Sequence, residues 1–213
     1  MDVVKKQNPF LSIWFYPKKT IKMQSAKSKR NGFFSLCFIA GLVYLSGLTQ
    51  VMTLGFYMNF IWTLVVIFIL AILFGYVVFS LGAFFVYIVG KCMKGKGQYK
   101  DIRLAIAWSH FPLIISLLIW ILLLMLYGQN IFVDFPGQLV LTENEVIFLF
   151  LIMAIQLVVY VWIIILLIQT IAEVQNFNAI KSILNLVIAS LLVLVISIGF
   201  FIGFLWIYTL FIV

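Results

Sequence analysis

Apolar residues gather into five long runs along the chain, separated by short polar segments. The runs cover residues 33–55, 60–89, 104–127, 146–168 and 183–213. A helix needs about 20 apolar residues to cross a hydrocarbon core about 30 Å thick, and every run reaches that length. The runs lack the alternation of a barrel strand, and a helix satisfies every backbone amide within lipid. The pattern therefore predicts an all-α integral membrane protein, a five-helix transmembrane bundle.

Two of the runs are longer than one crossing requires. At about 1.5 Å per residue, straight helices over residues 60–89 and 183–213 would exceed the hydrocarbon thickness. Such helices tilt, bend or project from the bilayer, and each run could also consist of two shorter elements. The expected bend positions are Gly75, Gly82, Gly199 and Gly203.

Composition supports the same class of protein. Of the 213 residues, 66% are hydrophobic and 9% are charged, and the mean hydropathy is +1.25. Soluble domains average about 45–50% apolar and about 25% charged residues. Lipid must therefore be the solvent for most of this chain.

The charged residues predict an orientation for the bundle. All fourteen Lys and Arg residues lie before the first run, between the second and third, or between the fourth and fifth. Residues 128–145 contain Asp134, Glu143 and Glu145 instead. Because positive residues stay in the cytoplasm during insertion, we expect a cytoplasmic amino terminus and an external carboxyl terminus. The basic residues that give the net charge of +8 thus lie at the edges of the predicted membrane spans. This placement argues against a nucleic-acid partner.

Two basic segments on the expected cytoplasmic side are candidates for a working surface. Residues 1–32 form a basic amphipathic segment before the membrane domain, 33–213, and combine aromatic side chains with lysines. Such segments lie in the headgroup layer against the anionic inner leaflet. The second segment joins the second and third runs. The residues predicted to bind lipid or a protein partner are Asn8, Pro9, Trp14, Pro17, Lys18, Lys19, Lys22, Gly95, Lys96, Gly97, Lys100 and Arg103. The alternative is that the lysines only anchor the protein in its orientation.

Three other polar residues have predicted roles. His110 has no nearby side chains to complete a metal site, so we expect packing or an interfacial hydrogen bond rather than a proton relay or a metal ligand. Glu173 is predicted to pair with Arg103 or Lys100 and so to join two cytoplasmic loops. Gln156, near the middle of the fourth run, is predicted to bond a neighbouring helix.

The sequence contains no pattern that indicates catalysis. The apolar runs hold no Asp, Glu, Lys or Arg at depth, which disfavours ion-coupled transport by this chain alone. There is no nucleophile with a base, no paired carboxylate site and no GxxxxGK[ST] nucleotide loop. We therefore expect a protein without enzymatic activity and without a cofactor.

Three short segments carry a family resemblance. Residues 8–21, NPFLSIWFYPKKTI, are similar to the opening N-P-W-x-S-x-W-x-x-P-x-x-T-I of bacterial members of the Yip-type (Ypt-interacting-protein) domain family. Residues 95–101, GKGQYKD, followed by Trp108 to Pro112, are similar to that family's G-G-K-G-x-[FY]-K segment with its later aromatic and proline. Residues 172–177, AEVQNF, are similar to its A-E-V-Q-x-F segment. In place of a frequent first glycine, this chain has Lys94, and histidine is not the family's rule at position 110.

The resemblance implies a five-span protein of the bacterial cytoplasmic membrane. Eukaryotic relatives act in vesicle trafficking with Rab-type GTPases, but the bacterial-type opening argues against transferring that role. Some bacterial members are associated with ABC-type exporters and with envelope or antimicrobial-peptide defence. The leading hypothesis is a non-enzymatic scaffold or accessory protein that binds anionic lipid and a membrane-protein partner, with an ABC transporter or a second copy of the chain as candidates. The alternatives are a small transporter or permeability pathway for an apolar or peptide compound, and a toxin-immunity protein that uses the acidic external loop.

Overall fold

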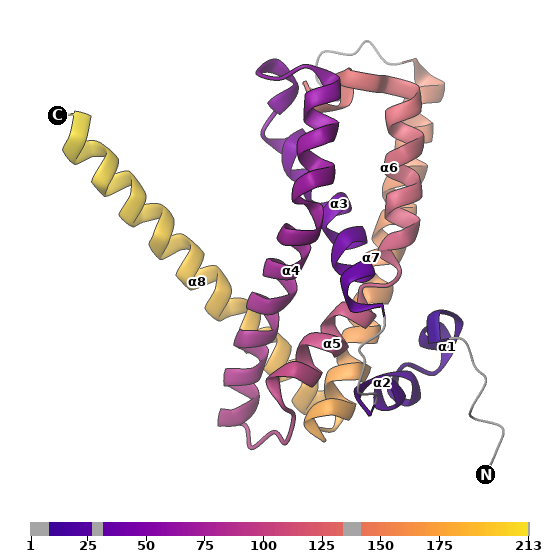
Figure 1. The fold of residues 1–213 in the computed structure, drawn as a ribbon, viewed down its shortest axis with the longest axis vertical. Coiled ribbons are helices and arrows are strands. Elements are labelled where there is room, and N and C mark those ends of the chain that lie inside the picture. Colours follow the sequence, from indigo (N-terminus) through magenta and orange to yellow (C-terminus); the bar gives the residue numbers. More distant parts are fainter. Residues whose placement is uncertain (1–8, 27–31, 134–141, 213) are drawn as a thin grey trace.

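The computed structural model describes residues 9–26, 32–133 and 142–212, and all regular structure in these ranges is helical (Figure 1). Two short helices, α1 and α2, precede a bundle of longer ones. The elements are α1 Pro9–Phe15, α2 Pro17–Ser25, α3 Phe33–Val51, η2 Leu54–Phe56, α4 Phe60–Cys92, α5 Tyr99–Ser109, α6 Leu113–Tyr127, η3 Gly128–Phe132, α7 Glu143–Gln175 and α8 Ala179–Ile212.

Five helical segments are long and apolar enough to cross a membrane, which confirms the predicted five-helix membrane fold. They are Phe33–Val51, Phe60–Cys92, Leu113–Phe132, Glu143–Gln175 and Ala179–Gly199. In Figure 1, α2, α5, the end of α4 and the turn from α7 to α8 lie together in the lower part of the molecule. The lysines and the arginine of the described ranges lie on these elements, on the loop between α4 and α5, or in the first turn of α8. We call this part of the molecule the basic end.

The third apolar run differs from the prediction, because it is two helices rather than one. A span beginning at residue 104 was expected, but α5 ends at Ser109 and α6 begins at Leu113. Pro112 separates them, since proline has no N–H to donate and disfavours helix in the residue before it. In α5, Ile102 and every residue from 104 to 109 are buried. The first part of this run therefore packs inside the protein at the basic end, and the crossing starts at residue 113.

The other long runs form continuous helices. Both α4 and α7 have 33 residues and α8 has 34. None of the four glycines at which bends were expected interrupts its helix. Gly75 lies at a close helix crossing, because a Cβ atom there would collide with the Cys37 carbonyl of α3. Gly41 of α3 likewise faces the Ala71 carbonyl of α4, so small residues let these two backbones touch.

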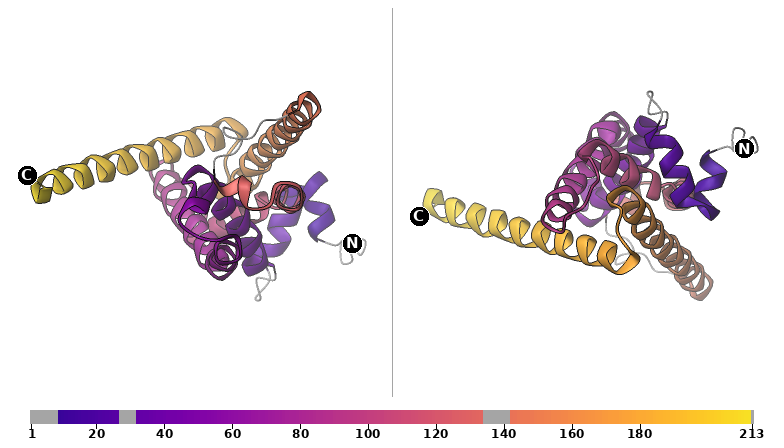
Figure 2. Two further views of the ribbon diagram at one scale, coloured as in Figure 1. Left: turned by 90° about the horizontal axis from the view of Figure 1, so that it is seen from above. Right: turned by 90° about the horizontal axis from the view of Figure 1, so that it is seen from below.

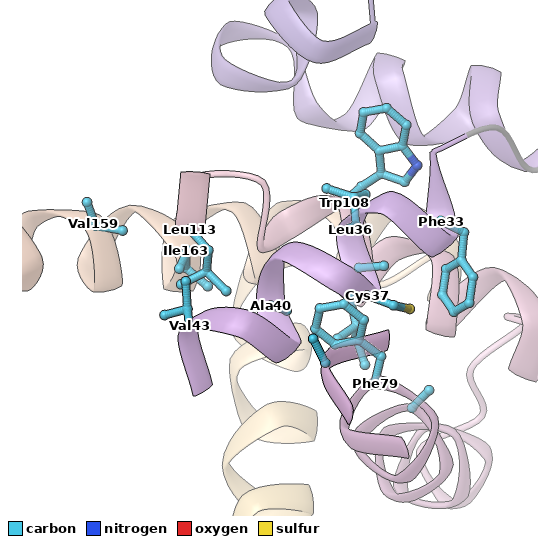
Figure 3. Packing of buried hydrophobic residues seen from close by; sticks show 14 of the residues in the cluster. Phe33, Leu36, Cys37, Ala40, Val43, Phe79, Trp108, Leu113, Val159 and Ile163 are labelled. Carbon is cyan, nitrogen blue, oxygen red and sulfur yellow. The ribbon is translucent and has the colours of Figure 1, made fainter. Parts of the chain in front are cut away.

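The buried core lies where α3 crosses α4 and α5. Figure 3 shows the Phe79 ring close to Cys37 and Ala40 of α3, with Trp108 of α5 on the other side of that helix. By contrast, α8 contacts α4 and α7 near its start and then leaves the bundle, as both views of Figure 2 show.

Candidate functional site

Gln175, the last residue of α7, fastens the loop between α4 and α5. Its side-chain Oε1 accepts a hydrogen bond from the N–H of Gly97 at 3.2 Å. Its backbone oxygen accepts one from the N–H of Lys96 at 3.1 Å. Its Nε2 donates to the carbonyl oxygen of Val86 in α4 at 3.4 Å. The GKGQYKD and AEVQNF segments, distant in sequence, thus meet in one buried junction.

Three glycines provide the space that this amide fills. A Cβ atom on Gly90 would collide with Nε2 of Gln175, and one on Gly95 would collide with Oε1. A Cβ atom on Gly97 would lie 3.0 Å from the same oxygen. The N–H of Gly95 also donates to the carbonyl oxygen of Gly90 at 2.7 Å, which closes the turn. The glycines of the loop are therefore required by the Gln175 side chain as well as by the turn.

The residue before this glycine segment has a strained backbone. Lys94 has a φ of 64°, in the left-handed region that costs a residue with a Cβ atom about 1–2 kcal/mol. Glycine adopts this conformation without that cost. A glycine at position 94 would therefore relieve this backbone strain.

Arg103 of α5 lies in a cage of aromatic rings and hydroxyl groups. Its Nη1 donates to Oη of Tyr76 at 2.9 Å and to Oγ of Ser80 at 3.5 Å. The guanidinium carbon lies 5.0 Å from the ring centre of Phe33, 5.1 Å from that of Tyr76 and 5.7 Å from that of Tyr99. Because a planar guanidinium stacks well on aromatic faces, this arrangement holds α3, α4 and α5 together.

The predicted pairing of Glu173 with Arg103 or Lys100 stays a prediction. The contacts that the structure describes for Arg103 are with the groups of this aromatic cage, and Glu173 is not among them. Reversing both charges would test the pair directly: rescue of a folding defect in either single variant requires that the two side chains interact.

Aromatic contacts dock the amino-terminal helices on the bundle. The Trp14 ring lies 5.8 Å from that of Phe111 and 6.5 Å from that of Trp162 in α7, between ring centres. Phe10 lies 5.2 Å from Trp108 and 5.5 Å from Phe111. These contacts hold the basic segment against α5 and α7.

Two hydroxyl groups fix α1 relative to α2. Oγ of Ser12 and Oγ1 of Thr20 lie 2.8 Å apart and share a hydrogen bond. Ile13 and Ile21 are fully buried beside them. The helices therefore form one packed unit, although neither would be stable alone at this length.

The residues predicted to form a binding face divide into two groups. The exposed group is Lys18, Lys19, Lys22, Lys96 and Lys100. The buried or half-buried group is Pro9, Trp14, Pro17, Gly95, Gly97 and Arg103. Asn8 lies outside the described residues. Among the described residues of this set, only the lysines are fully exposed to lipid or to a partner, and the second group holds them in place.

His110 and Gln156 make contacts of the kind predicted for them. Nδ1 of His110 lies 2.7 Å from the carbonyl oxygen of Ile106, and its ring packs 5.1 Å from that of Phe79. Within the described residues, no three His, Cys, Asp or Glu side chains are grouped to hold a metal ion. Oε1 of Gln156 accepts a hydrogen bond from Ser116 of α6 at 2.6 Å, which confirms the predicted bond to a neighbouring helix.

The acidic residues of the opposite end are partly used for capping. Glu145 and Thr142 form a capping box at the start of α7, with the Thr142 N–H donating to Oε2 of Glu145 at 2.8 Å. Asp134 lies outside the described residues. Glu145, one of the three acidic residues predicted to lie at this end, is thus engaged in helix capping.

A cleft of about 740 Å³ lies between α3, α6 and α7, in the half of these helices away from the basic end. Most of its lining is apolar, including Trp120 and Leu123 of α6. Its polar residues are uncharged: Tyr44, Gln50, Thr53, Gln156 and Tyr160. We call it the central cleft.

A family model described as the Yip1 domain matches residues 11–201. The chain belongs to the Yip1 domain family. The matched range includes α2, the five spans and α1 from Leu11 onward. No curated protein and no solved structure matches the chain.

Within this Yip1 domain, the GKGQYKD and AEVQNF segments stand out in the sequence, but the residues that join them do not. In the AEVQNF segment, Glu173 was predicted to make the contact with the other loop. The described bonds to the glycine loop are made by Gln175. Tyr76 was missed because it lies inside the apolar run of residues 60–89, and Gly90 because it directly follows that run; no local pattern marks either residue. The repeated glycines of the loop were the available signal, since closely spaced glycines often accompany a close approach.

Proposed function

We propose that this Yip1-domain protein is a non-enzymatic scaffold or accessory protein of a bacterial cytoplasmic membrane. Its basic end faces the cytoplasm and binds anionic lipid together with a membrane-protein partner. The partner that we propose is an ABC-type exporter, in a setting of envelope or antimicrobial-peptide defence.

The observation that supports this proposal is a set of exposed lysines on a rigid support. Lys18, Lys19 and Lys22 stand on α2, which packs against both α5 and α7. Lys96 and Lys100 stand on the loop and helix start that Gln175 fastens. Each lysine near an anionic leaflet contributes about 1 kcal/mol of attraction. A fixed array of such charges suits recognition of a partner as well as anchoring.

Copurification tests the accessory role. The full chain is extracted from its native membrane in mild detergent, and the proteins retained with it are identified by mass spectrometry. We expect a reproducible membrane-protein partner with the wild type, and its loss with the triple variant Lys18→Gln, Lys19→Gln, Lys22→Gln. The variant Lys181→Gln is the control, because Lys181 lies on α8 against the Phe177 ring and outside this array. Partner-free wild type in repeated preparations would refute the accessory role.

A permeability pathway is the second candidate, and the central cleft is the observation that favours it. The cleft is uncharged and confined to one half of the helices, while Phe79, Trp108 and Leu113 fill the interior toward the other end. A pathway would therefore require these packed residues to move apart. Flux of apolar or peptide compounds into liposomes that contain the purified chain is the direct test, and flux equal to that of empty liposomes would exclude this candidate.

A further inference from the structure

The central cleft has hydrogen-bonding groups that other residues leave unused. Oε1 of Gln156 accepts a hydrogen bond from Oγ of Ser116, while the Nε2 of this amide makes no hydrogen bond to any other described residue. The phenol oxygens of Tyr44 and Tyr160, and the amide of Gln50, are likewise without a hydrogen bond in the described ranges and line the same space. Polar groups at membrane depth cost free energy unless they are bonded, so a bound molecule that supplies partners is favoured.

Two apolar grooves lead away from this polar centre. One, of about 420 Å³, runs between α3 and α4 past Val51, Phe74 and Val78, and begins at Tyr44 and Gly47. The other, of about 540 Å³, is a shallow groove whose lining residues all belong to α7, Phe150 and Leu157 among them, and it shares Gln156 and Tyr160 with the cleft. A central polar region with two apolar extensions matches the shape of a lipid with two acyl chains.

The charges of the cleft restrict the headgroup. No lysine or arginine lines it, and the described cations stand at the opposite end of the helices. An anionic phosphate would have no counter-charge there, and burying it would be costly. Hydroxyl and ester oxygens of a ligand, in contrast, can accept hydrogen bonds from the phenol O–H and amide N–H groups of the cleft. Pockets of this size, apolar with a few polar groups, are typical small-molecule sites.

We propose that the central cleft binds one uncharged diacyl lipid of the diacylglycerol type. Its hydroxyl and ester groups bond Gln156, Tyr44 and Tyr160, and its acyl chains occupy the two grooves. Together with the proposed function, this gives the protein two lipid sites of different chemistry, with lysines for anionic lipid at one end and neutral polar groups for uncharged lipid at the other.

Gly47 allows a matched test. Nothing lies within 4 Å of a Cβ atom built on Gly47, which lines the cleft, so Gly47→Phe places a ring in open space. Gly82 of α4 is equally open and does not line the cleft, so Gly82→Phe is the control.

The full chain is reconstituted in phosphatidylcholine nanodiscs that contain a photoactivatable diacylglycerol, and the labelled peptides are mapped by mass spectrometry. A thermal unfolding curve of each variant reports whether it is folded, and Gly47→Leu replaces Gly47→Phe if the larger side chain prevents folding.

We expect the label in residues 43–53 and 149–160 of the wild type and of Gly82→Phe. In Gly47→Phe this labelling should fall about tenfold, equivalent to the loss of about 1.4 kcal/mol of binding free energy. Gln156→Leu should reduce it about threefold, as expected for one hydrogen bond. Unchanged labelling in Gly47→Phe overturns the proposal, as does equal labelling of these segments by a photoactivatable phosphatidylglycerol. A wild type that remains unlabelled, but whose oligomeric state changes with Gly47→Phe, would identify the cleft as a protein interface and also overturn it.

Discussion

The side-chain oxygen of Gln175 accepts a hydrogen bond from the backbone N–H of Gly97 at 3.2 Å, across 78 residues of sequence. We expect Gln175→Leu to lower the free energy of unfolding by about 1–3 kcal/mol, because it leaves a buried N–H without its partner. Thermal unfolding in detergent measures the change. Gln98→Leu is the control, since Gln98 is exposed and its side chain does not cap α5. Equal unfolding temperatures of the two variants would contradict a structural role for the junction.

Gly75 and Gly82 lie in the same helix but should respond differently to alanine. Gly75→Ala forces α3 and α4 apart, because the added methyl group meets the Cys37 carbonyl, and we expect a loss of about 1–3 kcal/mol. Gly82→Ala meets open space and should leave stability unchanged or raise it, since alanine favours helix by about 1 kcal/mol. Unfolding temperatures compare them. A Gly75→Ala variant as stable as Gly82→Ala would mean that the crossing is looser than the structure has it.

Lys94 offers a test of backbone strain. Lys94→Gly and Lys94→Ala both remove the same charge, but only glycine relieves the positive φ. We expect Lys94→Gly to be the more stable of the two by about 1 kcal/mol. The measurement is again thermal unfolding, and the opposite order would show that the loop does not keep this conformation.

The aromatic cage requires arginine rather than only a positive charge. Arg103→Lys keeps the charge but loses the planar group that contacts Phe33, Tyr76 and Tyr99, so stability should fall by about 1 kcal/mol. Lys100→Arg, at an exposed position of the same helix, should have little effect. If raising the salt concentration abolishes the difference, exposed charge rather than stacking explains it.

Trp14 should control access to the amino-terminal segment. Trp14→Ala removes the contacts with Phe111 and Trp162, so trypsin should cleave after Lys18 and Lys19 several times faster. Phe15→Ala is the control, because Phe15 is 79% exposed and loses little by truncation. The rate of cleavage of the purified protein, followed by mass spectrometry, separates the two. Similar rates would mean that Trp14 does not dock the segment.

The sequence predicted the spans because lipid imposes a simple requirement: enough consecutive apolar residues to cross it. The same requirement explains the error at α5. Residues 104–109 are apolar because protein surrounds them, and composition does not distinguish burial in protein from burial in lipid. Pro112 was the available sign of the break.

The site could be predicted only in part, for a different reason. The exposed lysines and the loop glycines follow from local sequence. The bonds that Gln175 makes to Gly97 and Val86 depend on how α4 and α7 pack, and that relation is set by contacts distant in sequence. The cage around Arg103 was missed for the same reason, because Tyr76 and Phe33 lie in two other helices.

The Gln175 junction also constrains the order in which the protein is completed during synthesis. The loop of residues 93–98 emerges long before residue 175, and until then the N–H groups of Lys96 and Gly97 lack their acceptors. Contacts this distant in sequence form late, because the chain between them must first be ordered. The three lysines of the loop and the start of α5 therefore take their final positions only after the fourth span has been inserted. A nascent chain that stalls before α7 would present its basic residues to chaperones and lipids in an arrangement that the finished protein never has.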